Sequence, residues 1–427
     1  MSSAPGVIAS PDLLAASATT WSPAQVPGTV ATTARAQNGL DLETAPDFDA
    51  SDWWYRCEFA ADVAGDTRSS RDVLCFDGLA THADVWLNGV HVLSSENMFL
   101  AHEVDVTSAL AATNVLVIRF RSLRQALQAR KPRPRWRTKL VEHQQLRWHR
   151  TTLLGRMPGW SPPVRAVGPW RAVRLERRTI AEIVSGDITP SVAGDDGVVD
   201  VSIAIRAVRG ATVRRGTLAV GAWRCDLELQ SRDDGSVALA GSLACPNAEQ
   251  WWPHTHGTPA RYNASLLIET DAGAITFDLG KVAFRSVHLD SADDGFALAI
   301  NGETIFCRGA CWTTPDIVSL AAPETTYRAL LTLARDAGMN MIRIGGTMVY
   351  EADCFYDLCD ELGIMVWQDF MFANMDYPAS DVNFARAVRE EAECVVMRLH
   401  RHPSVVLYCG NSEVEQQAAM LGLEPAL

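Results

Sequence analysis

Short stretches in which hydrophobic and polar residues alternate make up most of the chain before residue 288. Alternation with a period of two is typical of strands that bury one face. Asn88-Gly89 lies between two of these stretches and is a strong signal for a β-hairpin. Up to residue 178, the pattern predicts strands at Trp53–Phe59, Val73–Phe76, Ala83–Leu87, His91–Leu93, Val115–Phe120 and Trp170–Leu175. Short strands joined by Gly, Asn and Asp turns predict a β-sandwich.

A second series of alternating runs fills residues 179–287. It predicts strands at Ile183–Val192, Val198–Ala207, Thr217–Ala222, Ser236–Ala240, Tyr262–Thr270 and Ala274–Leu279. We interpret this part as an immunoglobulin-like β-sandwich that serves as a structural spacer. Its one aromatic cluster, Trp251-Trp252-Pro253-His254, could touch a ligand, but we favour a packed loop at a domain junction.

From residue 288 the pattern changes to short apolar runs that alternate with helical spacing. After a hairpin at Asn301-Gly302, strands are predicted at 306–309, 340–344, 364–367 and 405–409, and helices at 324–337, 352–362 and 383–400. Repeated strand–helix units with continuous apolar strands predict a parallel sheet covered by helices. An open doubly wound sheet and a (β/α)₈ barrel both fit. The absence of a GxGxxG motif after a strand argues against a dinucleotide fold.

Polar or aromatic side chains follow each of these strands: Trp312, Arg343, Asp369, and then Asn411 with Glu413. A (β/α)₈ barrel assembles its site at the carboxyl ends of its strands. Glu413 follows the apolar run Val405–Cys409 and is our candidate for a catalytic acid/base, although a Glu is also favoured in the first turn of a helix. The alternative for Asp369 is a structural partner of Arg343.

Length and composition narrow the classes of function. A chain of 427 residues is expected to form two or three domains. The net charge of −13 argues against nucleic-acid or anionic-membrane partners. No apolar run approaches the roughly 20 residues of a membrane helix, and the N-terminus does not resemble a signal peptide, so we expect a cytoplasmic protein. The ten Cys lack zinc-type spacing, so we expect free thiols and neither a metal nor another cofactor.

Residues 119–150 depart from the acidic average. They contain eleven Arg or Lys and one acidic residue, with Trp136 and Trp148 among them. Basic segments with aromatic residues can bind nucleic acid. Because the chain as a whole is acidic, we favour a solvated loop or an insertion in the sandwich, and its role is left open.

Several motifs carry a resemblance to a known family. In the first part these are Trp54-Tyr55-Arg56, Phe76-Asp77-Gly78-Leu79 and Gly168-Pro169-Trp170-Arg171, which is similar to a closing "GIWR" strand. In the last part they are Arg308-Gly309-Ala310-Cys311-Trp312, similar to "RGANW", the run from Phe355 to Phe370, and His402-Pro403-Ser404 with Gly410-Asn411-Ser412-Glu413, similar to "HPS…GNNE". Together they resemble the β-mannosidase-like branch of glycoside hydrolase family 2.

The resemblance implies a multidomain fold: a jelly-roll, sugar-binding-like β-sandwich over 1–178, an immunoglobulin-like sandwich over 179–287, and part of a TIM barrel over 288–427. It implies a retaining β-glycosidase acting on a carbohydrate, with Glu413 as general acid/base. The implied substrate-binding residues are Arg343, Asn411, Ser412, Trp312, Asp369 and Trp160. The sequence does not indicate an oligomeric state.

The chain departs from the family pattern at several sugar contacts. Ser412 stands where the family has Asn, Gly159-Trp160-Ser161-Pro162 stands where it has "GWDWG", and the Trp that follows the strand-two Arg is missing after Arg343. The family's nucleophile follows strand seven, whereas this sequence ends after the predicted strand four. We therefore expect the N-terminal half of a barrel that is inactive alone. The alternative is a carbohydrate-binding fragment or pseudoenzyme.

Overall fold

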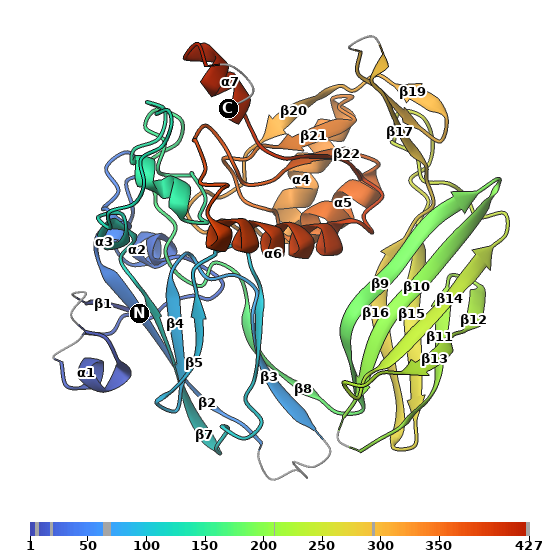
Figure 1. Ribbon diagram of the computed structural model, residues 1–427, viewed down its shortest axis with the longest axis horizontal. Helices are drawn as coiled ribbons and strands as arrows, with labels where there is room; N and C mark the ends of the chain where they lie inside the picture. The colour runs from blue at the N-terminus through green and yellow to red at the C-terminus, as the bar shows by residue number, and fades with distance from the viewer. Residues whose placement is uncertain (5–7, 18–19, 63–69, 209, 293–294, 424–427) are drawn as a thin grey trace.

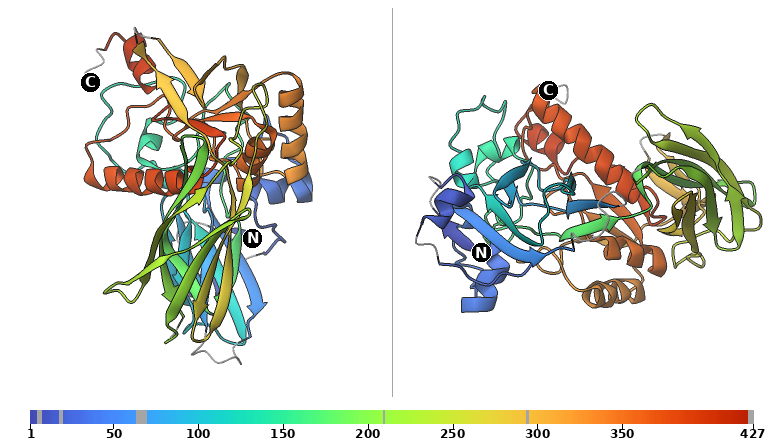
Figure 2. Two further views of the ribbon diagram at one scale, coloured as in Figure 1. Left: turned by 90° about the vertical axis from the view of Figure 1, so that its right-hand side faces the viewer. Right: turned by 90° about the horizontal axis from the view of Figure 1, so that it is seen from below.

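The computed structural model describes residues 1–4, 8–17, 20–62, 70–208, 210–292 and 295–423. Two β-sandwiches extend from the same side of a part that combines helices with a parallel sheet (Figures 1 and 2). None of the described helices is long and apolar enough to cross a membrane.

The N-terminal sandwich consists of a five-stranded sheet, in the order β1-β2-β7-β4-β5, and a three-stranded sheet, β6-β3-β8. Apolar side chains from both sheets, among them Leu74, Phe76, Val85 and Phe120, form one buried core. The strands are β1 (Ser2–Ala4), β2 (Asp52–Ala60), β3 (Arg71–Phe76), β4 (Ala83–Leu87), β5 (Val90–Ser95), β6 (His102–Asp105), β7 (Thr113–Phe120) and β8 (Val173–Arg178).

Short helices accompany this sandwich, and the hairpin predicted at Asn88-Gly89 joins β4 to β5. Asn88 takes a left-handed φ of 51°, which Asn tolerates better than most residues. The closing strand lies at β8, a few residues later than predicted, and β6 was missed. The helices are α1 (Pro11–Ala15), α2 (Val30–Asn38), η1 (Phe48–Ala50), α3 (Leu123–Ala126) and η2 (Gln144–Trp148).

The middle part is a sandwich of two four-stranded sheets, β13-β14-β10-β9 and β12-β11-β15-β16. Its core combines inward-facing residues of both sheets, such as Ile203, Leu218, Leu239 and Leu266. The sequence missed the short strands β12 and β13. The strands are β9 (Ala181–Ala193), β10 (Asp196–Ala207), β11 (Val213–Val220), β12 (Trp223–Asp226), β13 (Glu228–Ser231), β14 (Val237–Cys245), β15 (Tyr262–Thr270) and β16 (Gly273–Val282).

The last part begins with a small antiparallel sheet and continues into a parallel sheet in the order β20-β21-β22-β23. Helices between the strands bury its apolar side chains. The strands are β17 (Val287–Asp290), β18 (Ala297–Ile300), β19 (Glu303–Ile305), β20 (Gly309–Trp312), β21 (Met341–Ile344), β22 (Met365–Asp369) and β23 (Val405–Cys409). The helices are α4 (Glu324–Asp336), α5 (Asp353–Leu362), α6 (Val382–Leu399) and α7 (Val414–Met420).

Two details of this last part differ from expectation. The first parallel strand is β20 at Gly309–Trp312, not residues 306–309, because the pairing with β21 starts at Gly309 opposite Met341. The strand β23 was expected to be buried on both faces. It lies at the edge of the sheet, and only Val405 of its residues is fully buried.

The aromatic cluster of the middle sandwich packs at a domain junction, as predicted. Trp251 is fully buried, and its indole N–H donates to the carbonyl of Asp360 in α5 at 2.9 Å. The backbone N–H of His254 donates to the carbonyl of Gly363, which ends the same helix. These contacts fix the middle sandwich against the helical layer.

The basic segment 119–150 connects the N-terminal sandwich to the parallel-sheet part. Arg150 forms a buried bidentate pair with Glu391 of α6, and Arg135 binds Asp376 after β22. Apolar residues of the segment, such as Val141 and Leu146, share a buried cluster with Ala373. The segment lies between β7 and β8, as expected of an insertion in the sandwich, and part of it is exposed. It is not a loop that is solvated throughout, because its buried members form an interface between domains.

Candidate active site

The carboxyl ends of the parallel strands bring Arg343 and Asp369 together. Arg343 lies in β21 and Asp369 ends β22, the neighbouring strand. Arg343 Nη2 donates to Asp369 Oδ2 at 2.7 Å. Asp369 is fully buried, and this burial raises the pKa of its carboxyl group, while the hydrogen bond from Arg343 opposes the rise. The pair fixes a guanidinium at the end of the sheet.

Ser412 lies beside this pair and joins two loops. Its hydroxyl is 3.3 Å from Arg343 Nη2. Its backbone N–H donates to the carbonyl of Phe372 at 2.7 Å, and its carbonyl accepts from the N–H of Asn374 at 3.2 Å. These two backbone hydrogen bonds join the loop after β23 to the loop after β22. They fix the position of Ser412, the residue directly before Glu413.

Glu413 follows at the point where the chain turns into helix α7. Its backbone has a left-handed φ of 62° and ψ of 18°, which is unusual for a residue with a Cβ. Its side chain makes no capping hydrogen bond to the helix and is exposed. The side chain of Asn411 caps the turn instead, accepting from the N–H of Val414 at 3.1 Å. Glu413 therefore does precede a helix, but its carboxylate is left free of that role.

A cavity of about 560 Å³ opens at this end of the sheet. Three of the predicted site residues, Arg343, Asn411 and Glu413, line this cavity. Two others, Ser412 and Asp369, contact the side chain of Arg343. Its lining residues are Arg343, Trp367, Cys409, Asn411, Glu413, Glu415, Gln416, Gln417 and Met420.

Trp367 is a member of this site that the sequence prediction missed. The guanidinium of Arg343 lies 5.1 Å from the centre of its ring, within the range of a cation–π contact. Trp367 is the register partner of Arg343 and stands two residues before Asp369 in β22. Because side chains two apart in a strand share a face, the alternation around Asp369 could have identified it.

Trp312 lies outside this cavity. Its indole N–H donates to Glu351 Oε1 at 2.8 Å, and its ring packs on Phe355 with 5.0 Å between centroids. The hydroxyl of Tyr327 donates to the other oxygen of Glu351 at 2.6 Å. Burial raises the pKa of Glu351. These contacts fix Trp312 against the helices α4 and α5, and its contact with a sugar stays a prediction.

Trp160 is also separate from the cavity lining. Its side chain is 63% exposed, in a loop of the N-terminal sandwich. The hydroxyl of the next residue, Ser161, accepts from the N–H of Gly155 at 3.0 Å and so bonds within its own loop. No described contact joins Trp160 to Glu413 or Arg343.

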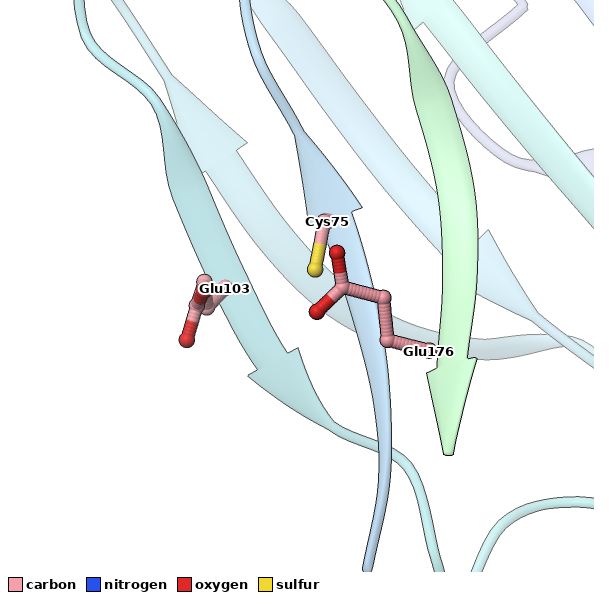
Figure 3. Close-up of side chains that lie close together, drawn as sticks. All are labelled: Cys75, Glu103 and Glu176. Carbon is pink, nitrogen blue, oxygen red and sulfur yellow. The ribbon is translucent and has the colours of Figure 1, made fainter. Parts of the chain in front are cut away.

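Two clusters of described side chains are of the kind that bind metals: Asp357, Asp360 and His402 in the parallel-sheet part, and a second one in the N-terminal sandwich. Cys75, Glu103 and Glu176 come from the neighbouring strands β3, β6 and β8, and their ligand atoms lie within 4.8 Å of one another (Figure 3). Arg178 pairs with Glu103 at 2.6 Å and with Glu176 at 3.0 Å. Burial and the acidic neighbours raise the pKa of the Cys75 thiol to about 11. We interpret this cluster as an ion-pair network.

Comparisons with known proteins agree with the motifs. Residues 12–171 match the family model described as glycosyl hydrolase 2 galactose-binding domain-like. The chain is 33% identical over 434 residues to β-mannosidase B of Aspergillus terreus, covering 95% of the chain and 50% of that protein. It is 32% identical over 433 residues to β-mannosidase of Rattus norvegicus, covering 92% and 48%.

Residues 12–171 therefore form a domain of the glycoside hydrolase family 2 type, and over most of its length the chain is similar to β-mannosidases. A solved structure, the β-D-mannosidase from Dictyoglomus thermophilum, superposes with a TM-score of 0.82 at 29% identity, covering 92% of this chain and 50% of that one. The exo-chitosanase of Amycolatopsis orientalis superposes with a TM-score of 0.71 at 20% identity, covering 94% and 47%, which shows the shared fold alone.

The chain described here spans about half the length of the curated relatives that it matches. The match covers the sugar-binding-like sandwich, the middle sandwich and the parallel sheet with its helices.

Proposed function

We propose that this chain is the N-terminal part of a retaining β-glycosidase that acts on β-mannosides or related β-glycosides, with Glu413 as general acid/base. The observation that carries the proposal is the position of Glu413: it follows a parallel strand, is free of helix capping, and opens into the same cavity as Arg343. The matches to β-mannosidases supply the substrate class.

The proposed architecture divides the chain after residues 178 and 287. The middle sandwich is assigned as immunoglobulin-like, and the four parallel strands as half of a (β/α)₈ barrel. Retaining glycosidases use two carboxyl groups about 5–5.5 Å apart. Asp369 is engaged by Arg343 and is not assigned as the second one. The nucleophile would come from residues that follow this sequence in a longer chain.

In this mechanism Glu413 protonates the oxygen of the departing group while the nucleophile attacks the anomeric carbon. It then takes a proton from the water that hydrolyses the glycosyl-enzyme. Arg343, held by Asp369 and close to Ser412, would provide a fixed cation and hydrogen-bond donor beside the sugar.

The test is Glu413→Gln in the longest natural form of the protein, assayed with nitrophenyl β-mannosides. The turnover number should fall by about 10²–10⁴-fold, the range of general acid–base catalysis, with a smaller change in binding. Glu415→Gln is the matched control, because Glu415 lines the same cavity. Azide can take the place of water in attacking the glycosyl-enzyme and needs no general base to do so. Added azide should therefore restore turnover in the Glu413→Gln variant. Equal rates in the two variants would remove Glu413 from the mechanism.

A carbohydrate-binding protein without catalysis is the second candidate. It is favoured by Ser412, which has replaced the Asn of the family motif and contacts Arg343. Under this alternative, the longest natural form binds manno-oligosaccharides, and neither it nor its Glu413→Gln variant releases nitrophenol. Turnover that depends on Glu413 would exclude the alternative.

A further inference from the structure

Five basic side chains form an exposed strip in the segment between β7 and β8. We call Arg130, Lys131, Arg133, Arg137 and Lys139 the basic strip; all of them are exposed. From Lys131 to Lys139 the basic residues recur at every second position. The strip gives a local positive field on a chain whose net charge is −13.

The backbone of the strip is held in place from beneath. Between its charged residues, Trp136 and Thr138 are 7% and 8% exposed and so anchor the segment. Arg147, only 4% exposed, donates from Nη2 to the carbonyl of Pro132 at 3.0 Å and from Nη1 to that of Asp376. The cations therefore project from a fixed segment, which lowers the entropy lost when a ligand binds.

The basic strip has no acidic side chain paired with it in the part of the chain that the structure describes. Arg135, in the same segment, binds Asp376 at 2.6 Å. In contrast, none of the five strip residues has a carboxylate partner within the described ranges. Lys131 makes only a cation–π contact, with its Nζ 5.0 Å from the centre of the Trp148 ring. Unpaired cations at neighbouring positions repel one another, and a bound anion would relieve this repulsion.

The strip lies next to the candidate active site. The hydroxyl of Thr138 is 3.5 Å from Oε1 of Gln417, and Gln417 lines the cavity together with Glu413. The bond from Arg135 to Asp376 joins the same segment to the loop after β22. Figure 1 shows this segment beside α6 and below α7, and Figure 2 shows the same neighbourhood from two other sides.

We propose that the basic strip binds the anionic groups of an acidic glycan whose neutral end enters the cavity at Glu413. Glu413 and Glu415 give the cavity itself a negative lining, so a carboxylate or sulfate is favoured outside it and over the strip. The choice of a glycan rests on the proposed function. The strip would then make the protein select glycans by the charge of the sugar units beyond the cleavage site.

The aromatic residues of the segment argue against single-stranded nucleic acid as the ligand. Binding of that kind relies on exposed aromatic rings on which bases stack. Trp136 is buried, and the ring of Trp148 is occupied by Lys131 and by Arg147, whose guanidinium lies 5.1 Å from its centre. The segment thus offers charge without a stacking surface.

The test measures binding of the longest natural form to short β-linked oligosaccharides of equal length. The probes are a mannuronate oligosaccharide, a sulfated manno-oligosaccharide, the neutral manno-oligosaccharide and a single-stranded DNA oligonucleotide. The variant is Arg133→Glu/Arg137→Glu/Lys139→Glu. The control carries the same charge change on the middle sandwich, Arg224→Glu/Arg232→Glu/Lys281→Glu, at exposed positions. A triple Gln variant of the strip removes the charges without reversing them.

We expect an anionic oligosaccharide to bind about tenfold more tightly than the neutral one at low salt and to lose this advantage near 1 M salt, where charges are screened. The strip variants should abolish the advantage and the control should retain it. The two anionic probes distinguish carboxylate from sulfate recognition. Equal binding of neutral and anionic sugars, or tighter binding of the DNA, would overturn the proposal. This experiment measures binding and not turnover. Its outcome is therefore independent of the test of Glu413 as general acid/base.

Discussion

The guanidinium of Arg150 and the carboxylate of Glu391 form two hydrogen bonds, of 2.8 and 2.6 Å, although their side chains are only 3% and 1% exposed. Arg150 precedes the closing strand of the N-terminal sandwich, and Glu391 lies in α6. Asn97 and the hydroxyl of Tyr350 each donate to the same carboxylate at 2.9 Å. The carboxylate therefore binds groups from both sides of a domain interface.

Glu391→Gln should destabilise the protein by about 3–5 kcal/mol, because it leaves the Arg150 charge buried without its counter-ion. Chemical denaturation measures the change in the free energy of unfolding. The control is Glu390→Gln on the same helix. Glu390 pairs with Arg386 at 3.2 Å, with side chains 48% and 67% exposed, so its loss should cost less than about 0.5 kcal/mol. Equal costs would show that the buried pair does not hold the interface.

This pair also shows where prediction from the sequence ends. Alternation and turn residues identified most strands of the sandwiches, and β23 was placed at its observed bounds, because such patterns are local. Arg150 and Glu391 are 241 positions apart, and no local pattern reports such a partnership. The basic segment 119–150 was therefore interpreted from its composition as a solvated loop or an insertion. In the structure, residues between its basic positions, such as Trp136 and Thr138, are buried.

The candidate site was predictable to a similar extent. Arg343, Asn411 and Glu413 were found because they lie near the carboxyl ends of parallel strands, and these ends share one edge of a sheet. Trp312 is the last residue of a strand as well, yet it contacts Glu351 and the helical layer. Which way a side chain at the end of a strand turns depends on its packing partners, and those come from distant parts of the chain.

Asp369→Asn should lower the free energy of unfolding by about 1–2 kcal/mol, since it removes the charge that pairs with Arg343. The Arg343 side chain is 31% exposed, so water limits the cost relative to a fully buried pair. Asp336→Asn provides the control, because Asp336 pairs with Arg335 at the exposed end of α4. A destabilisation no larger than that of the control would show that Asp369 does not hold Arg343 in place.

His82 and His149 should make stability fall in acid. Their Nε2 and Nδ1 atoms are 3.0 Å apart, and burial lowers the pKa of both imidazoles from an ordinary value of 6.5. Their contribution is complete above pH 6.5 and is lost as the pH falls toward the lowered folded-state pKa values, because only the unfolded chain takes up the protons.

The slope from each His cannot exceed about 1.4 kcal/mol per pH unit. Urea denaturation at a series of pH values should therefore show a flatter profile for His82→Gln/His149→Gln than for the wild type below pH 6.5. His91→Gln, at an exposed position in β5, is the control and should follow the wild type. Identical profiles for all three proteins would refute the assignment.

The left-handed backbone of Glu413 predicts opposite effects for two neighbouring substitutions. The left-handed conformation costs a residue with a Cβ roughly 1 kcal/mol of conformational free energy, whereas Gly adopts it without this cost. Glu413→Gly should therefore stabilise the turn into α7, while Glu415→Gly, in the first turn of that helix, should destabilise it by about 1 kcal/mol. Hydrogen exchange of the α7 amides measures this local stability directly.

Slower exchange in Glu413→Gly and faster exchange in Glu415→Gly would show that the chain keeps a carboxylate at a strained position at the expense of stability, as expected where function selects the residue. Faster exchange in both variants would mean that the left-handed backbone at Glu413 does not destabilise the turn.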